Sequence, residues 1–176
     1  MPQDTSELIQ FLRRVHQVRE YTPEPVPKDE LTQVLQVGRW TGSASNRQTS
    51  EVVVVTDQAA RQVIAEGGAR MAGGADVALV IVTLGEPGRE ALEIFDEGRM
   101  AERLLIAAEA FGLGSAIATL KGDGPTNVKQ LLGIPAERRA ITVVTVGVPD
   151  TAAIAAKPKN PQPRKPLEQY AHWGQY

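Results

Sequence analysis

His16 and Arg19 are the first residues of the chain whose types and spacing suit the binding of an anion. They lie in the segment 15–21, directly after an amphipathic stretch. An imidazole and a guanidinium that leave a helix end together can bind a phosphate group or the carbonyl edge of a ring. We therefore expect His16, Gln17 and Arg19 to form one part of a binding site. A packing role for His16 stays open, because histidine is intermediate in burial and often only caps a helix or packs.

A polar loop between Gly42 and Ser50 supplies a second candidate. Its side chains are mostly small and polar, and it directly precedes a run of valines. Such a loop is suited to hydrogen bonding around the rim of a planar heterocycle. The loop residues predicted to bind a ligand are Ser43, Ala44, Asn46 and Gln48.

Backbone groups supply a third candidate. The turn 112–115 leads into a predicted strand that ends at Thr119 and Leu120. Exposed N–H groups at such a strand end can donate hydrogen bonds to a ring. The glycine pair of this turn most often forms only a helix C-cap and a tight turn, and it is not the longer Gly-x-Gly-x-x-Gly phosphate loop.

Arg164 and Lys165 form a fourth candidate, near the C-terminal end. A basic pair is usually a solvated patch, but this one lies in a proline-rich stretch predicted to be extended. The aromatic end that follows, with Tyr170 and Trp173, would be wasteful in a free tail. We expect the aromatic end to pack on a second subunit, and the basic pair to bind a phosphate.

Composition limits what these segments can do. The chain has 176 residues, a hydrophobic content of 42% and a net charge of -2, which favours one domain and argues against a nucleic-acid partner. It has no cysteine, so redox chemistry must come from a bound cofactor. No stretch approaches the roughly 20 apolar residues that span a bilayer, and we expect a cytoplasmic protein without a membrane partner or a metal site.

Apolar periodicity predicts five helices that hold these segments in place. A second helix beginning at Pro27 carries Leu31, Val34, Leu35 and Trp40 on its inner face. Asp96 is expected to cap the long central helix rather than to act as an acid. The other helices are predicted over 5–15, 58–66, 95–111 and 125–132.

Four apolar runs predict strands. The run 52–55 is entirely valine, which favours a strand buried on both faces. The other strands are expected over 77–83, 115–120 and 140–148. Residues 1–148 then form one domain, and 149–176 form its arm, in which 149–166 is predicted to be extended without helix.

In their order and positions, these segments resemble the FMN-dependent nitroreductase family over nearly the whole chain. The family opens with Arg-Arg-Ser-Val-Arg before an aromatic residue, continues with Pro-Ser-Ala-x-Asn-x-Gln-Pro-Trp before the first strand, and closes with a basic tail. The matching residues are Arg19, Tyr21, Ser43, Ala44, Asn46, Gln48, Arg164 and Lys165, together with Asp96-x-Gly98 and 104–108 of the central helix and the turn 112–115.

The resemblance implies an α+β fold with a mostly antiparallel central sheet flanked by helices. It also implies an intertwined homodimer with an extended C-terminal tail and two FMN sites between the subunits. The first motif and the tail would then hold the ribityl phosphate, while the loop 43–48 would come from the partner subunit. Dimerisation becomes a condition for cofactor binding.

The activity implied is that of an FMN-dependent NAD(P)H oxidoreductase. NADH or NADPH would reduce the flavin, and a nitroaromatic, quinone or related acceptor would then take the electrons in a ping-pong cycle. The chemistry would be carried by FMN, with no catalytic side chain. Two alternatives remain: a flavin-binding relative with another reductive activity, such as ene reduction, dehalogenation or flavin breakdown, and a non-enzymatic flavin-binding protein.

The chain departs from the family pattern at several positions. Val15 stands at the first arginine of the opening motif, His16 at the second, and Gln17 at the serine. Gly42 replaces a proline, Thr49-Ser50 replaces Pro-Trp, and Arg103 replaces an asparagine of the central helix. Loss of an arginine contact is expected to weaken FMN binding.

Overall fold

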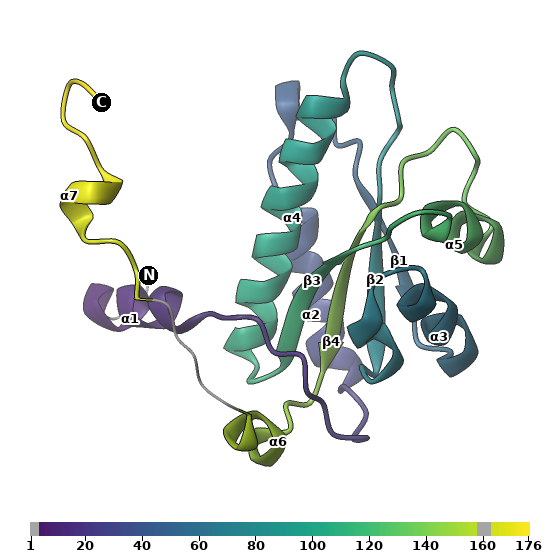
Figure 1. Cartoon of the computed structure of the whole chain (residues 1–176), viewed down its shortest axis with the longest axis horizontal. Coiled ribbons are helices and arrows are strands. Elements are labelled where there is room, and N and C mark those ends of the chain that lie inside the picture. The colour runs from purple at the N-terminus through teal and green to yellow at the C-terminus, as the bar shows by residue number, and fades with distance from the viewer. Residues whose placement is uncertain (1–3, 158–162) are drawn as a thin grey trace.

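The computed structural model describes residues 4–157 and 163–176. Its described part is built around one four-stranded sheet, in which all neighbouring strands are antiparallel (Figure 1). The strands follow the order β1-β2-β4-β3 across the sheet. Their bounds are Glu51–Val55 for β1, Val77–Val82 for β2, Gly114–Thr119 for β3 and Thr142–Gly147 for β4. The predicted α+β class with an antiparallel sheet is confirmed.

Helices cover both faces of this sheet (Figure 1). α2 and α4 pack on one face, and α3 and α5 pack on the other. The helices are α1 (Thr5–Arg14), α2 (Lys28–Arg39), α3 (Gln58–Glu66), α4 (Glu90–Ala110), α5 (Gly124–Leu132), α6 (Thr151–Ala156) and α7 (Leu167–Tyr170).

β2 lies inside the sheet and is buried along its whole length. Successive side chains of a strand point to opposite faces, and β2 divides accordingly. Val77 and Leu79 contact the cluster under α2 and α4, whereas Ala78 and Val80 contact the cluster under α3 and α5. β2 therefore serves both halves of the core, as predicted for a buried strand.

The prediction that the valine run 52–55 is buried on both faces is wrong. β1 is the first strand in the sheet order, and among its residues only Val55 is buried. Val54 remains 40% exposed. β-branched residues favour an extended backbone wherever the strand lies, so their run predicts the strand but not its position at an edge.

The central helix α4 begins at Glu90, five residues before the predicted start at 95. Asp96 therefore lies inside the helix, and the prediction that it caps the helix is wrong; Arg89 occupies the N-cap position. α2 crosses α4 closely at Gly38, where an added Cβ would lie 2.7 Å from Leu104 Cδ2. Small residues at this crossing allow α4 to lie deep in the core.

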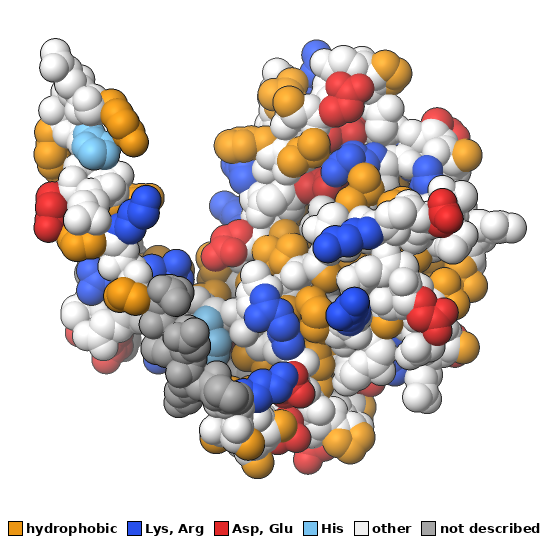
Figure 2. Space-filling model, in the orientation of Figure 1, with side chains coloured by type: hydrophobic (Ala, Val, Ile, Leu, Met, Phe, Trp, Pro, Cys, Tyr) orange, Lys and Arg blue, Asp and Glu red, His pale blue; other side chains and the backbone are white. Residues whose placement is uncertain are grey.

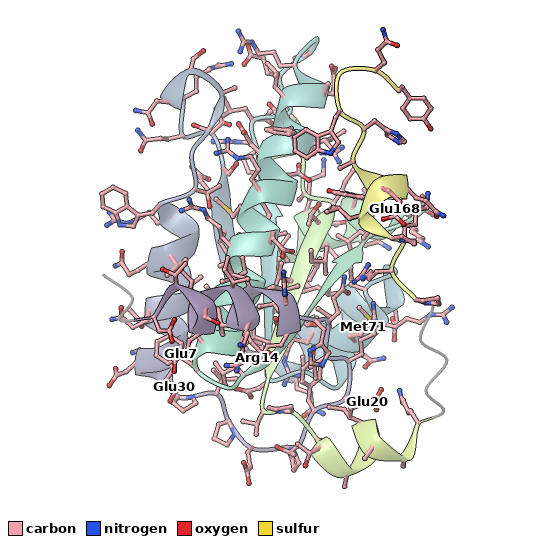
Figure 3. The ribbon with its side chains drawn as sticks, turned by 90° about the vertical axis from the view of Figure 1, so that its left-hand side faces the viewer. Glu7, Arg14, Glu20, Glu30, Met71 and Glu168 are labelled. Carbon is pink, nitrogen blue, oxygen red and sulfur yellow. The ribbon has the colours of Figure 1, made fainter. Side chains whose placement is uncertain are left out.

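Two apolar surfaces are exposed in the single chain. Trp40, predicted on the inner face of the second helix, is 74% exposed, because α2 ends at Arg39 and the chain turns away there. α1 buries none of its residues. Its last residue, Arg14, reaches the C-terminal part of α4, with Arg14 Nε 3.8 Å from Glu109 Oε1 (Figure 3). These surfaces are free to contact a second molecule.

The prediction that the arm contains no helix before residue 166 is wrong. Residues 151–156 form α6, and Asp150 caps it by accepting a hydrogen bond from Ala153 N at 2.9 Å. The stretch from Thr151 to Ala156 is rich in alanine and holds no proline, so nothing prevents a helical turn there. The predicted extended residues 158–162 lie outside the described residues.

Two buried carboxylates of α4 bind the end of the sheet at which β2 ends and β4 begins. Glu97 is 2% exposed and accepts hydrogen bonds from Arg139 Nε and Thr142 Oγ1, both at 2.7 Å. Glu93 accepts a hydrogen bond from Thr83 Oγ1 at 2.7 Å. Buried charged groups require such partners, so this network fixes α4 on the sheet.

Glu93 is expected to make stability depend on pH. Burial raises its pKa, but hydrogen bonds from Thr83, Glu86 N and Gly85 N outweigh burial and hold the pKa below the ordinary value of a glutamate. A lowered folded-state pKa contributes stability above the unfolded-state pKa, and this contribution is lost as the pH falls through the folded-state pKa. Glu93→Gln should therefore flatten the fall in unfolding free energy below about pH 4.5, measured by urea denaturation between about pH 6 and 3.5. The exposed Glu102→Gln variant should keep the wild-type slope, and an unchanged slope in Glu93→Gln would contradict this role.

Candidate active site

The first predicted motif runs along the outer edge of β3. Val18 N donates to Ser115 O at 2.8 Å, and Val18 itself is buried. Thr22 N donates to Val148 O at 2.9 Å, which extends the attachment to the end of β4. Because Val18 points inward, Gln17 and Arg19 on either side of it are exposed.

Tyr21 anchors this motif. Its hydroxyl donates to Val18 O at 2.6 Å and lies 2.8 Å from Thr145 Oγ1. Its ring packs on Gly147, where an added Cβ would lie 2.7 Å from Tyr21 Cδ1. Burial raises the pKa of Tyr21 to about 12, so the hydroxyl stays protonated and acts as a structural donor. This residue sets the path of the chain on which Arg19 is presented.

Arg19 and His16 keep free binding capacity. Arg19 Nη2 donates to Gln17 Oε1 at 2.8 Å, and both side chains are exposed. His16 Nδ1 lies 2.8 Å from Arg14 O, so its other ring nitrogen is left for a ligand. The side chains of all three predicted residues are therefore exposed, and those of Gln17 and Arg19 are in contact.

The second predicted segment is a tightly held loop. Ser43 Oγ accepts a hydrogen bond from Gln48 N at 2.8 Å, and Ala44 N donates to Asp96 Oδ2 at 3.0 Å. Ser45, Asn46 and Gln48 all have φ of 53°, in the left-handed region that side chains with a Cβ rarely adopt. Backbone strain of this kind persists only where surrounding contacts impose it. Here Asp96 supplies one of those contacts.

A single chain does not bring these two segments together. The loop is fixed near Asp96, in the first half of α4, whereas the first motif is attached beyond the C-terminal end of α4, at Ser115. The 14 residue steps from Asp96 to Ala110 span roughly 20 Å at 1.5 Å per residue. The two predicted segments are therefore attached at different ends of α4 in the single chain.

The third predicted segment is correct only in part. Leu120 is buried, and its N–H donates to Ile141 O at 2.9 Å, so the prediction that this N–H is free for a ring is wrong. In an antiparallel ladder, successive N–H groups point to alternate sides. The N–H of Thr119 therefore points to the open side of β3, and its side chain is exposed.

The fourth predicted segment stands away from the body of the chain. Arg164 and Lys165 are exposed, and Trp173 at the end of the arm is 93% exposed. Figure 2 shows basic and hydrophobic side chains gathered on this arm, facing basic side chains on the body. Figure 3 places Glu168 on the same arm, on the side of α4 away from α2. Within residues 4–157 and 163–176, no element covers the aromatic end, whose Tyr170 and Trp173 are exposed.

A cleft of about 140 Å³ lies under the loop, between the end of α2 and α4. Thr41 and Asp96 take part in it, and the sequence reasoning assigned neither to a site. The sequence predicts Asp96 as a helix cap, and its separation of 52 residues from Ala44 gives no signal of the contact that it makes with the loop. The lining residues are Arg39, Thr41, Gly42, Ser43, Gln48, Ser50, Asp96 and Met100.

Comparison of the sequence with known proteins points to the nitroreductase family. The model of the nitroreductase family matches residues 12–67, which include both the first motif and the loop. The NADPH-flavin oxidoreductase of Vibrio harveyi is 26% identical over 176 residues, covering 90% of this chain and 70% of that protein.

Solved structures share the fold. A putative NADH dehydrogenase/NAD(P)H nitroreductase from Parabacteroides distasonis superposes with a TM-score of 0.81 at 25% identity, covering 97% of this chain and 99% of that one. A putative nitroreductase from Desulfovibrio desulfuricans, in complex with FMN, gives a TM-score of 0.77 at 21% identity, covering 96% and 97% of the two chains. The chain thus has the nitroreductase fold. The resemblance to the FMN-dependent nitroreductase family is confirmed by these matches.

In the described part of the chain, no helix is long and apolar enough to cross a membrane.

Proposed function

We propose that this protein is an FMN-dependent NAD(P)H oxidoreductase that works as a homodimer. The observation that carries the proposal is the division of the binding residues between the two ends of α4. A site assembled from the first motif of one copy and the loop of another fits a ligand with a phosphate at one end and a planar ring at the other. The names of the matched relatives point to the same chemistry.

The residues present fit FMN. His16 offers a donor for the phosphate, the arm adds Arg164 and Lys165, and Arg19 on the same motif offers an exposed guanidinium for the ring system. Across the dimer, Ser43, Asn46 and Gln48 offer polar groups on a rigid loop, and Thr119 offers a backbone donor. Bidentate or charge-assisted hydrogen bonds are the strongest available to a phosphate.

Bound FMN would supply the hydride acceptor and pass the electrons on, so no protein nucleophile is required. The chain's residues bind and orient the ligand, and Arg19 is our candidate for stabilising negative charge on the ring system. We propose a ping-pong cycle in which the oxidised nicotinamide leaves before the acceptor binds.

The proposed acceptors are quinones and nitroaromatics. Only residues 83–89 separate β2 from α4, which leaves no room for a covering helix at this point of the chain. An open cleft should accept bulky planar acceptors.

Dimerisation is supported by the exposed apolar surfaces. α1 exposes Leu8, Ile9 and Leu12, and the arm exposes Tyr170 and Trp173. A second copy of the chain would cover both.

Anaerobic reduction tests the proposed function. The flavin-loaded protein is expected to bleach when NADH or NADPH is added without air, and to regain its colour when a quinone is added. A yellow protein that does not bleach would instead be a flavin-binding protein without this activity.

Val15→Arg is expected to tighten FMN binding. Val15 stands where the family pattern has an arginine, and a charge-assisted hydrogen bond contributes about 1.5–3 kcal/mol. Flavin fluorescence titration of the FMN-free protein should therefore give a Kd lowered roughly tenfold. Val15→Gln, which adds length without charge, serves as the control. An unchanged or raised Kd for Val15→Arg would contradict the alignment of this motif.

A further inference from the structure

Two buried polar atoms without hydrogen-bond partners lie in the walls of the cleft under the loop 42–50, between the end of α2 and α4. They are Thr41 Oγ1 and Asp96 Oδ1, two of only three buried side-chain atoms left unpartnered among the described residues. Buried polar groups are nearly always hydrogen-bonded. Two exceptions in a single cleft indicate a place for a ligand group.

Asp96 is fixed in an orientation that leaves one oxygen for this ligand group. The side chain is 5% exposed, and its Oδ2 is committed to Ala44 N at 3.0 Å. The nearest cation to Oδ1 is Arg99 Nη1, at 3.5 Å, which is beyond a good hydrogen-bond distance. Oδ1 can therefore accept a hydrogen bond from a group in the cleft.

The charges around the cleft favour an uncharged group. The carboxylate of Asp96 would repel an anion, while Arg39 in the wall and Arg99 beside Asp96 disfavour a cation. Thr41 can either donate or accept, and Met100 adds an apolar wall. An acceptor next to a hydroxyl donor is complementary to an N–H next to a C=O.

The size of the cleft limits the group further. Its volume of about 140 Å³ is close to that of an engineered apolar cavity of about 150 Å³ that binds benzene. That is room for the edge of a ring or for a carboxamide, and it is too small for a whole flavin.

We propose that this cleft is a subsite for a planar, uncharged amide edge, in which Asp96 Oδ1 accepts from the N–H and Thr41 Oγ1 donates to the C=O. Two ligands of the proposed function carry this edge: the pyrimidine ring of the flavin and the carboxamide of the nicotinamide. The proposal rests on the proposed function and adds to it two residues, Asp96 and Thr41, that would form hydrogen bonds to the amide edge of the ligand.

Analogues that remove the N–H distinguish the two sources. In the first arm, FMN and 3-methyl-FMN are titrated against FMN-free protein by flavin fluorescence. In the second arm, the saturation constant of anaerobic flavin reduction is compared for NADH and for its 3-acetylpyridine analogue, in which a methyl group replaces the carboxamide nitrogen.

The variants are Asp96→Asn, which turns the acceptor into a donor, and Thr41→Val, which removes the hydroxyl without changing the shape. Glu102→Gln and Thr32→Val are the matched controls on α4 and α2, away from the cleft.

Wild-type protein is expected to bind the analogue at least about tenfold more weakly in one arm, since hydrogen bonds to charged groups are the stronger class. Asp96→Asn and Thr41→Val should reduce that discrimination in the same arm, and the controls should keep it. Thr41→Val alone decides the matter if Asp96→Asn does not fold. A flavin-loaded, active protein that discriminates in neither arm, or whose variants discriminate like wild type, would overturn the subsite alone and indicate that water fills the cleft. A protein that takes up no flavin would overturn the proposed function, and the subsite with it.

Discussion

A chain that ends at Asn160 is expected to be monomeric and to lose FMN. Such a truncation removes the aromatic end, with Tyr170 and Trp173, which is exposed in the single chain. Aromatic anchors commonly dominate contacts between subunits, so their removal should dissociate the dimer. Because the candidate binding segments are attached to α4 roughly 20 Å apart, the proposed FMN site needs both copies, and we expect the monomer to lose it.

The matched variant Arg164→Ala with Lys165→Ala separates the two effects. It keeps the aromatic end, so the dimer should survive. It removes two cationic groups proposed to contact phosphate, each contributing about 1.5–3 kcal/mol, so FMN affinity should fall at least about tenfold. Analytical ultracentrifugation and a fluorescence titration of FMN measure the two properties independently. A truncated chain that stays dimeric and retains FMN would show that the arm takes no part in the site.

Glu97→Ala is expected to lower the unfolding free energy by about 3–5 kcal/mol, the range for breaking a buried ion pair by removing one partner. The change leaves Arg139 and the hydroxyl of Thr142 without their acceptor, whereas Thr83 keeps its hydrogen bond to Glu93. Urea denaturation at pH 7 gives the value directly.

Glu102→Ala is the control for this measurement. Glu102 lies on the same helix and is exposed, so its loss should change the free energy by no more than about 0.5 kcal/mol. Equal effects of the two changes would mean that the network around Glu97 does not fasten α4 to the sheet.

The elements of the fold could be predicted from the sequence because local patterns define them. Asp57 precedes α3 and accepts a hydrogen bond from Ala60 N, as a capping residue should. The valines of β1 likewise favour a strand, but whether another strand lies beyond it depends on the tertiary arrangement. The alanine run of α6 was hidden by the prolines around it, which suggested an extended chain over their whole span.

The candidate site was predictable only where its residues are adjacent in the sequence. Arg19 and Gln17 form a local pair, and Ser43 and Gln48 close one loop. Asp96 is 52 residues away from the backbone it holds, and its position before an apolar run is equally typical of a cap. Long-range contacts of this kind leave no local pattern, so Asp96 and Thr41 emerge only from the structure.

Flavin content tests the central claim most directly. Purified protein is incubated with FMN, freed of unbound ligand and denatured, and the released cofactor is identified by mass spectrometry and quantified by absorbance. The account predicts FMN, in a ratio of about one per subunit, since the symmetric pairing of two copies creates two equivalent sites. Release of FAD, or of no flavin at all, would contradict it.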